Sequence, residues 1–352
     1  MQGIEVKAHK ERPAFDVAKI GMCFLIMVIH IMPVNTIPDG LKLLAPVTRV
    51  AVPVFFMISG YLFFSKLKLR STETSKRDYL KKMIFRNTKL YLFWSLILLP
   101  VTYSYRHYGQ FTNLKKVFIV GWHVLFGSTF IASWYLSALV IGLIIIFFLS
   151  RHFTAKQILL VVLPAYIWCV LTSNYSKLGW LSFFAHSWLR QSAFSWAPYN
   201  SFLVALLWLA IGKAFVDHET LLFKGTKKQL IMILGFMGLL YIEQLIIIYF
   251  NSYSTNDCYF TLVPLCAAIF SLLLNVVVHF KRTKILRTFA TITYCAHASL
   301  SQLIIYLYSL TTLTFGEASL IFLIITVICA VTTLLVTRLE RYPHLAWLKY
   351  SH

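Results

Sequence analysis

Long apolar runs separated by short polar segments dominate this chain, and ten of the runs approach the length of a membrane-spanning helix. A helix needs about 20 apolar residues to cross the hydrocarbon core, whereas barrel strands show a strict alternation that these runs lack. The pattern therefore predicts an all-α fold, a polytopic membrane helix bundle with about ten transmembrane helices. The predicted spans are residues 15–34, 46–65, 87–105, 133–150, 157–173, 200–216, 229–250, 258–279, 289–311 and 318–336.

One further apolar segment, residues 115–131, is interrupted by Gly121, His123 and Gly127. We expect it to be re-entrant or interfacial rather than an eleventh span.

Composition supports the membrane assignment. The chain is 59% hydrophobic and 13% charged, whereas a soluble domain has about 45–50% apolar and about 25% charged residues. The six cysteines lie in or beside apolar runs without a Cys-x-x-Cys motif, so they are expected to be small buried side chains. We expect no metal site and no bound cofactor.

The net charge of +21 is distributed as the positive-inside rule requires. Lysine and arginine concentrate in alternate loops, above all in residues 66–86, and are sparse in the loops between them. This asymmetry places both termini in the cytoplasm, with residues 1–14 and 337–352 as cytoplasmic tails of a single membrane domain, 1–352. It also favours the lipid bilayer, and not nucleic acid, as the partner of the basic residues.

The first span carries ionisable residues, which are costly inside a membrane and often mark a functional path. Asp16, Lys19 and His30 fall along one face of a helix, because eleven residues amount to about three turns. The alternative is a structural role, with Lys19 reaching toward the lipid headgroups and His30 packed in the bundle.

Depth along each span, counted from the helical rise, groups further residues. Six side chains fall at a similar depth in the outer half: His30, Arg49, Glu243, Asp257, Trp134 and Tyr135. Tyr294 and His297 fall in the inner half of the ninth span. Charges at span ends are often solvated, and Trp and Tyr are common at the membrane interface, so those readings remain open for Arg49, Asp257, Trp134 and Tyr135. A carboxylate as deep as Glu243 needs a partner, for which we expect His30 or a substrate hydroxyl.

The second span carries the most specific motif. Residues Thr48–Phe64, TRVAVPVFFMISGYLFF, resemble the second-helix signature of the membrane acyltransferase 3 family. The preceding Asp16-xx-Lys19-x(10)-His30 is similar to that family's Asp-xx-Arg-x(10)-His motif, with lysine in place of arginine. The charge is kept at this position, but the bidentate fork of arginine is lost.

Two later segments extend the resemblance over most of the chain. Trp134-Tyr135-Leu136 resembles the family's Trp-Tyr-Leu element. Thr293-Tyr294-xx-His297 resembles its Ser-Tyr-xx-Tyr-Leu-xx-His stretch, although Cys295-Ala296 stands where Tyr-Leu is usual. Within the family the chain looks especially like the O-acetyltransferase of enterobacterial common antigen and the membrane domain of vancomycin-resistance serine racemases.

The resemblance implies an enzyme that moves an acyl group, expected to be acetyl, from cytoplasmic acyl-CoA to a hydroxyl of a cell-envelope glycan or lipid-linked saccharide. Acetyl-CoA would be a co-substrate, and the location would be a bacterial plasma membrane. The expected catalytic residues are His30 as general base, Arg49 for the oxyanion, and Glu243. The expected substrate-binding residues are Lys19, Asp16, Trp134, Tyr135, Asp257, Tyr294 and His297.

A second hypothesis is a membrane carrier of a small polar solute such as serine, like the membrane domain of the racemases. A racemase would need a soluble pyridoxal-binding domain after the spans, and the sequence stops at His352 without one. This favours the acyltransferase.

Overall fold

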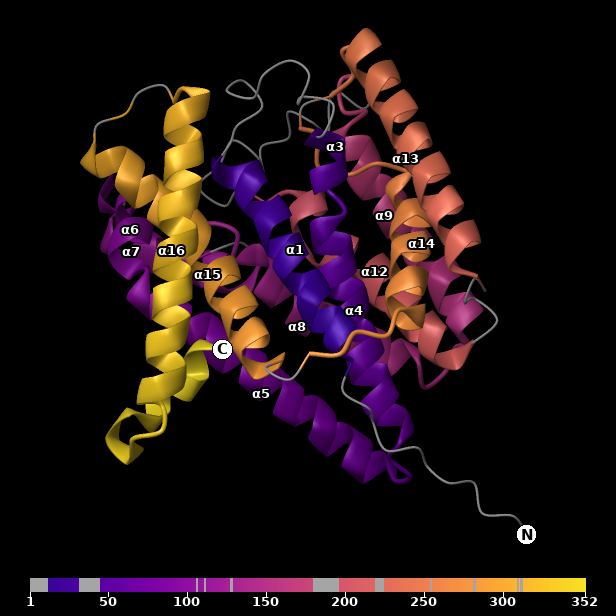
Figure 1. The fold of residues 1–352 in the computed structure, drawn as a ribbon, viewed down its shortest axis with the longest axis horizontal. Coiled ribbons are helices and arrows are strands. Elements are labelled where there is room, and N and C mark those ends of the chain that lie inside the picture. The colour runs from indigo at the N-terminus through magenta and orange to yellow at the C-terminus, as the bar shows by residue number, and fades with distance from the viewer. Residues whose placement is uncertain are drawn as a thin grey trace.

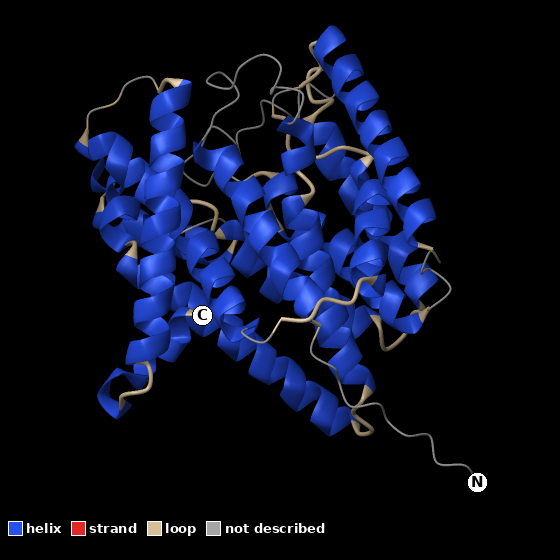
Figure 2. Ribbon diagram, viewed as in Figure 1, coloured by secondary structure: helices blue, strands red, loops and turns tan. Residues whose placement is uncertain are grey.

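The computed structural model describes residues 12–31, 45–105, 107–110, 112–126, 129–179, 196–218, 225–253, 255–280, 283–308, 310 and 313–352. In this part of the chain every regular element is helical, and the connections are turns and short loops (Figure 2). The predicted all-α fold is confirmed.

Within the described residues, ten long helices overlap the ten predicted spans. They are α1 (Pro13–Ile31), α4 (Ala51–Lys68), α5 (Glu73–Ile97), α8 (Trp134–Leu149), α9 (Ala155–Ser173), α12 (Phe202–Asp217), α13 (Thr226–Tyr249), α14 (Leu262–Asn275), α15 (Thr283–Leu307) and α16 (Phe315–Leu339). The shorter pieces are α3 (Ala45–Thr48), α6 (Leu99–Tyr105), α7 (Asn113–Leu125) and the 3-10 turns η2 (Tyr108–Gln110), η3 (Pro198–Asn200) and η5 (Pro343–Ser351).

Five helices of the described chain are long and apolar enough to cross a membrane by length and composition alone: α1, α3–α4 taken together, α9, α13 and α16. In Figure 1, α13 and α16 stand at opposite edges of the bundle. Both expose large apolar side chains, among them Leu234 and Leu323, as lipid-facing helices do. The number of spans and the cytoplasmic termini stay predictions, as does the relation of α7 to the bilayer.

Three helix boundaries differ from the predicted span boundaries in ways that matter for the site. Helix α5 begins at Glu73, so most of the cation-rich segment predicted as a loop is helical. Helix α15 begins at Thr283 and not near residue 289. The segment predicted as a cytoplasmic tail, 337–352, folds: α16 continues to Leu339, and η5 returns against α5, where the Trp94 indole donates to the Ser351 carbonyl at 3.0 Å.

The centre of the bundle is the crossing of α4 and α12. A Cβ atom on Gly60 would lie 2.7 Å from the Leu209 carbonyl oxygen, and one on Gly212 would lie 2.4 Å from the Met57 carbonyl oxygen. Both distances are too short for a side chain, so the two glycines permit this close approach of backbones. Helix α12 is buried on all faces from Val204 to Phe215, as expected of a helix that is apolar all round.

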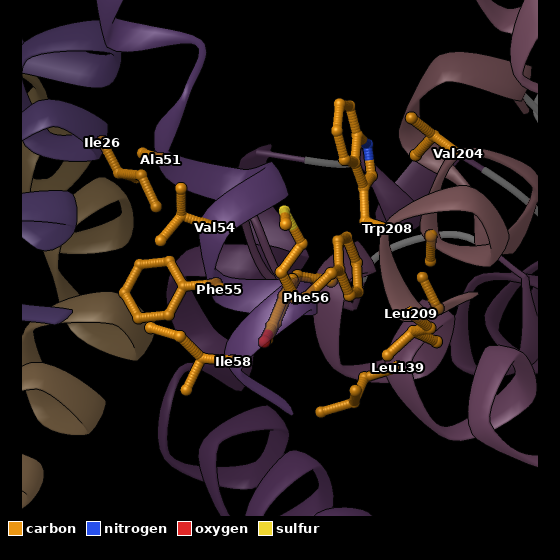
Figure 3. Packing of buried hydrophobic residues seen from close by; sticks show 14 of the residues in the cluster. Ile26, Ala51, Val54, Phe55, Phe56, Ile58, Leu139, Val204, Trp208 and Leu209 are labelled. Carbon is orange, nitrogen blue, oxygen red and sulfur yellow. The ribbon is translucent and has the colours of Figure 1, made fainter. Parts of the chain in front are cut away.

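Helix α4 distributes its large side chains over several neighbours. Figure 3 shows Phe55 and Phe56 leaving α4 in different directions, Phe56 toward Trp208 of α12. Both phenylalanines are buried, as are all six cysteines, none of which forms a disulfide. This core supports two cavities that carry the polar chemistry.

Candidate functional site

The first cavity, here named the histidine cavity, has a volume of about 220 Å³ and lies near the end of α1 that follows His30. It is lined by Ile26, Ile29, His30, Arg49, Val52, Pro53, Trp134, Tyr166, Tyr199, Asn200, Val204, Trp208, Asp257, Cys258 and Leu262. Four of the six residues predicted to share one depth therefore meet here, from α1, α3–α4, α8 and the loop before α14. Tyr135 and Glu243 lie elsewhere.

Arg49 and Asp257 form an ion pair within this cavity, with Nη1 of Arg49 at 2.7 Å from Oδ1 of Asp257. The backbone N–H of Asp257 donates to the Ser173 hydroxyl at 3.1 Å, which anchors the carboxylate to the end of α9. The two charges are partly exposed and neutralise each other. The guanidinium retains further N–H groups for a second acceptor.

Glu243 does not pair with His30, so that expectation is corrected. Its carboxylate accepts hydrogen bonds from the backbone N–H groups of Phe260 and Thr261, each at 2.9 Å, from the Thr261 hydroxyl, and from the Tyr175 hydroxyl at 3.1 Å. The donors from Phe260 and Thr261 stand at the start of α14, where an anion satisfies unpaired N–H groups and meets the positive end of the helix, and Tyr175 donates from the segment after α9. Glu243 therefore holds the loop that presents Asp257.

His297 stands beside His30, with the ring centroids 5.2 Å apart. The predicted depths separate His297 from His30, whereas the structure places the two rings side by side; α15 begins earlier than expected, and each residue adds about 1.5 Å of rise. The Nδ1 atom of His297 is 2.9 Å from the carbonyl oxygens of Thr293 and Tyr294, so Nδ1 carries the proton. Within the described chain, its buried Nε2 has no hydrogen-bond partner, so a lone pair is left near His30.

The second cavity, here named the cation cavity, has a volume of about 540 Å³. Its walls come from α1, α4, α5, α8, α15 and the C-terminal His352. The polar lining residues are Lys19, Ser59, Lys66, Tyr79, Arg86, Asn87, Tyr135, Lys284, Arg287, Thr288, Thr291, Tyr294 and His352. Five of them are lysine or arginine, and they lie toward the predicted cytoplasmic ends of their helices.

Two carboxylates compensate part of this positive charge. Asp16 is 3.8 Å from both Lys19 Nζ and Arg287 Nε, and Glu340 is 2.6 Å from Lys284 Nζ. Lys66 and Arg86 form no ion pair in the described part of the chain. The cation cavity thus keeps a net positive charge.

Glu340 also ties the C-terminal segment to this cavity. Its Oε2 atom is 2.9 Å from Nε2 of His352, whose Nδ1 is 3.2 Å from the Thr288 hydroxyl. Burial raises the pKa of the Glu340 carboxyl, but the hydrogen bonds from Lys284 and His352 outweigh burial and hold that pKa below its usual value.

Helix α1 joins the two cavities. Lys19 lines the cation cavity and His30 the histidine cavity, and eleven residues of helix separate them by about 16 Å. Trp134 and Tyr135, predicted at one level, face opposite ways: the first lines the histidine cavity and the second the cation cavity. Successive residues of a helix point about 100° apart, which explains the split.

Several residues of both cavities are not singled out by sequence reasoning. Tyr166, Tyr199 and Asn200 line the histidine cavity, and Ser59 and Phe55 line the cation cavity. Tyr166, Tyr199 and Asn200 are ordinary residues of an apolar span or loop, so composition and spacing carry no signal for them. Phe55 and Ser59 lie within the Thr48–Phe64 motif, but the motif does not distinguish them from their neighbours. Arg86 is visible in the sequence only as one cation among many in residues 66–86.

A family model described as an acyltransferase domain matches residues 12–338, nearly the whole chain. The chain belongs to this acyltransferase family. The resemblance identified from the sequence motifs is confirmed, and the match includes both cavities apart from the C-terminal segment.

Curated relatives of this chain carry other names. An amino-acid racemase of Enterococcus faecalis is 30% identical over 49% of this chain and 25% of its own length. A serine/alanine racemase of Enterococcus gallinarum is 27% identical over 41% of this chain and 20% of its own length. The chain thus spans about a quarter of the length of these relatives or less. No solved structure matches significantly.

Proposed function

We propose that this protein transfers an acyl group, acetyl in the first instance, from cytoplasmic acyl-CoA to a hydroxyl of a cell-envelope glycan or lipid-linked saccharide in a bacterial plasma membrane. One observation carries the proposal: a net-positive cavity and a histidine-bearing cavity lie at the two ends of the Lys19–His30 stretch of α1. Family membership supports the reaction class, and the two cavities support the assignment of a side to each substrate.

The cation cavity suits the donor. CoA carries a diphosphate and a further phosphate, and unpaired Lys and Arg side chains bind such groups through charge-assisted hydrogen bonds. Lys66 and Arg86 are free of acidic partners in the described chain, and Lys19 and Arg287 share a single aspartate. A donor held there would direct its thioester arm along α1 toward His30.

The histidine cavity suits the acceptor. In the proposed reaction His30 takes the proton of the acceptor hydroxyl as its oxygen attacks the thioester carbonyl. A tetrahedral intermediate forms, and a remaining N–H of Arg49 is the candidate donor to its oxyanion. The C–S bond then breaks, the ester is released, and the proton on His30 passes to the CoA thiolate. The lone pair on Nε2 of His297 would accept a hydrogen bond from the charged His30 ring.

The remaining expected site residues take supporting roles in this proposal. Asp257 holds Arg49, and Glu243 holds the loop that carries Asp257. Asp16 holds Lys19 and Arg287, while Trp134 forms part of the acceptor wall. Tyr135 and Tyr294 stand at the donor end, where the acyl group would arrive.

A test uses inverted vesicles, whose cytoplasmic face is accessible. Vesicles with and without the protein would receive radiolabelled acetyl-CoA and isolated cell-envelope glycans. Label appearing in the glycan only with the protein supports the proposal. Label that stays in acetyl-CoA with every glycan fraction argues against the donor or the acceptor class, and CoA binding to the purified protein then separates the two.

The second candidate function is a carrier for a small polar solute such as serine. Two observations favour it: the relatives are named racemases of amino acids, and the Arg49–Asp257 pair offers one charge of each sign in a small cavity. Radiolabelled serine accumulating in proteoliposomes, without any acyl transfer, would favour the carrier over the acyltransferase.

A further inference from the structure

The end of the cation cavity nearest the histidine pair is lined by three aromatic rings from three helices. Phe55 of α4, Tyr135 of α8 and Tyr294 of α15 all line this cavity and are otherwise buried. Their ring centroids are 6.1 Å apart for Phe55 and Tyr135, 6.3 Å for Phe55 and Tyr294, and 5.2 Å for Tyr135 and Tyr294. We call these three residues the aromatic wall.

The aromatic wall is braced from behind. The Tyr294 hydroxyl donates to the Ala132 carbonyl, and the Tyr135 hydroxyl lies 3.2 Å from the Ser59 hydroxyl. The Phe56 ring packs against the Tyr135 ring, with the two ring centroids 4.3 Å apart. In Figure 3, Phe55 points away from Phe56 and lies near Val54 and Ile58. Braced rings in a close-packed interior have little freedom to move aside.

The aromatic wall separates the cations from the histidine pair. Tyr294 is 6.4 Å from His297, which in turn is 5.2 Å from His30. On the other face, Trp134 lines the histidine cavity next to Tyr135 in the chain. A thioester arm reaching from the cation cavity toward His30 therefore has to pass these rings before its acyl group meets the histidine pair.

We propose that the aromatic wall selects the donor by acyl-chain length, admitting acetyl and excluding chains of four or more carbons, with Phe55 as the limiting residue. This inference rests on the proposed function, because it requires acyl-CoA in the cation cavity. Phe55 is the one ring of the three whose side chain carries no hydrogen-bonding group. Removing it opens apolar space without stranding a polar partner, whereas truncating either tyrosine would leave a buried polar group unpaired.

The expected effect follows from the transfer of methylene groups. Butyryl-CoA has two more methylenes than acetyl-CoA, and each methylene that finds apolar room gains about 0.8 kcal/mol, or about fourfold in affinity. In the wild type that room is occupied by the Phe55 ring. In Phe55→Ala the room is free, so the ratio of butyryl-CoA affinity to acetyl-CoA affinity should rise about 15-fold.

The experiment measures binding, so it needs no acceptor. The purified full chain in detergent is titrated with CoA, acetyl-CoA and butyryl-CoA by isothermal calorimetry. Phe55→Ala and the milder Phe55→Leu are compared with Phe147→Ala, a matched truncation at a buried phenylalanine of α8 that lines neither cavity. Affinity for CoA alone reports whether each variant keeps the donor site folded.

The expected result is a wild type that binds acetyl-CoA at least as tightly as butyryl-CoA, and a ratio shifted toward butyryl-CoA in both Phe55 variants but not in Phe147→Ala. Wild-type protein that binds no CoA overturns the proposed donor and this inference with it. CoA binding that persists with an unshifted ratio overturns the length selector alone. If Phe55→Ala loses CoA binding, Phe55→Leu decides: an unshifted ratio there refutes the selector.

Discussion

The two cavities share α1, α4 and α8, but the charges are balanced in one cavity and unbalanced in the other. In the histidine cavity the cation Arg49 is matched one to one by Asp257 at 2.7 Å. In the cation cavity five lysines and arginines meet two carboxylates, and Lys66 and Arg86 have no ion pair in the described chain. The volumes differ as well, about 220 Å³ against about 540 Å³.

This difference separates two kinds of binding chemistry. A matched pair orients its two members and leaves little net field, so it suits a neutral polar ligand such as a sugar hydroxyl. Unmatched cations create a positive potential that attracts a polyanion. The aromatic wall lines the cation cavity at the end nearest the histidine pair, where a donor and an acceptor would meet.

The largest effect should come from removing the base. His30→Gln should lower acyl transfer by about 10²–10⁴-fold, because general-base catalysis contributes that much, while CoA affinity stays as in the wild type. Label transfer in inverted vesicles and calorimetric CoA binding measure the two quantities. His152→Gln, in the turn after α8, is the matched control. Near-wild-type transfer by His30→Gln would remove His30 from the mechanism.

Breaking the Arg49–Asp257 pair should reduce acyl transfer by less than the removal of His30. Arg49→Met should reduce acyl transfer by about 10–100-fold and also reduce the yield of folded protein, because Asp257 is left as a partly buried, unpaired anion. The double variant Arg49→Met with Asp257→Asn should recover the folded yield but not the activity. Recovery of both, measured by size-exclusion chromatography and label transfer, would show that the pair is purely structural.

Removing one unmatched cation should act on the donor alone. Arg86→Met should raise the Kd for CoA about tenfold, the value of a lost charge-assisted hydrogen bond to phosphate, and should make binding less sensitive to salt. Arg77→Met, at an exposed position of the same helix, is the control. An unchanged Kd in Arg86→Met, at low and at high salt, contradicts the assignment of the donor to this cavity.

Glu243 provides a test between catalysis and positioning. Glu243→Gln keeps an acceptor for the N-terminus of α14 but loses the charge, so we expect a stability loss of about 1–2 kcal/mol and a decrease in transfer of less than tenfold. Thermal unfolding and transfer rates report the two effects. A loss above a hundredfold with unchanged unfolding would instead make Glu243 catalytic.

The smallest effect concerns pH and the C-terminal segment. The Glu340 carboxyl has a lowered pKa in the folded protein, so its ion pairs stabilise the fold above the pKa of the unfolded chain. This contribution is lost as pH falls through the lower, folded value. Thermal stability of the wild type should therefore fall more steeply below about pH 4.3 than that of Glu340→Gln. If thermal stability falls with pH in parallel for the wild type and Glu340→Gln, the ion pairs of Glu340 make no such contribution.

Local sequence patterns were sufficient to predict those features whose residues all lie on one helix. The apolar runs predicted the ten long helices, and the spacing of Lys19 and His30 placed both on α1, because helix periodicity depends only on neighbouring residues. The motif around Arg49 and Trp134 identified the family for the same reason. These features needed no knowledge of how the helices pack.

Contacts between residues far apart in the chain could not be predicted from the sequence in the same way. Depth counted from a predicted boundary carries the error of that boundary, which led to different predicted depths for His297 and His30, although the two rings lie side by side. Spacing along the chain also says nothing about which neighbour a helix face meets. Glu243 was therefore expected at His30, although it binds the start of α14.

The sequence by itself determined the class of protein, the helices and the line of ionisable residues on α1, because hydrophobicity and helical periodicity are local properties. Only the tertiary structure decided that Arg49 meets Asp257, that His297 stands beside His30, and that the aromatic wall lines the cation cavity at the end nearest the histidine pair. Those contacts join residues far apart in the chain. Their geometry follows from the close crossing of α4 and α12 at Gly60 and Gly212 and from the packing of the other helices around it.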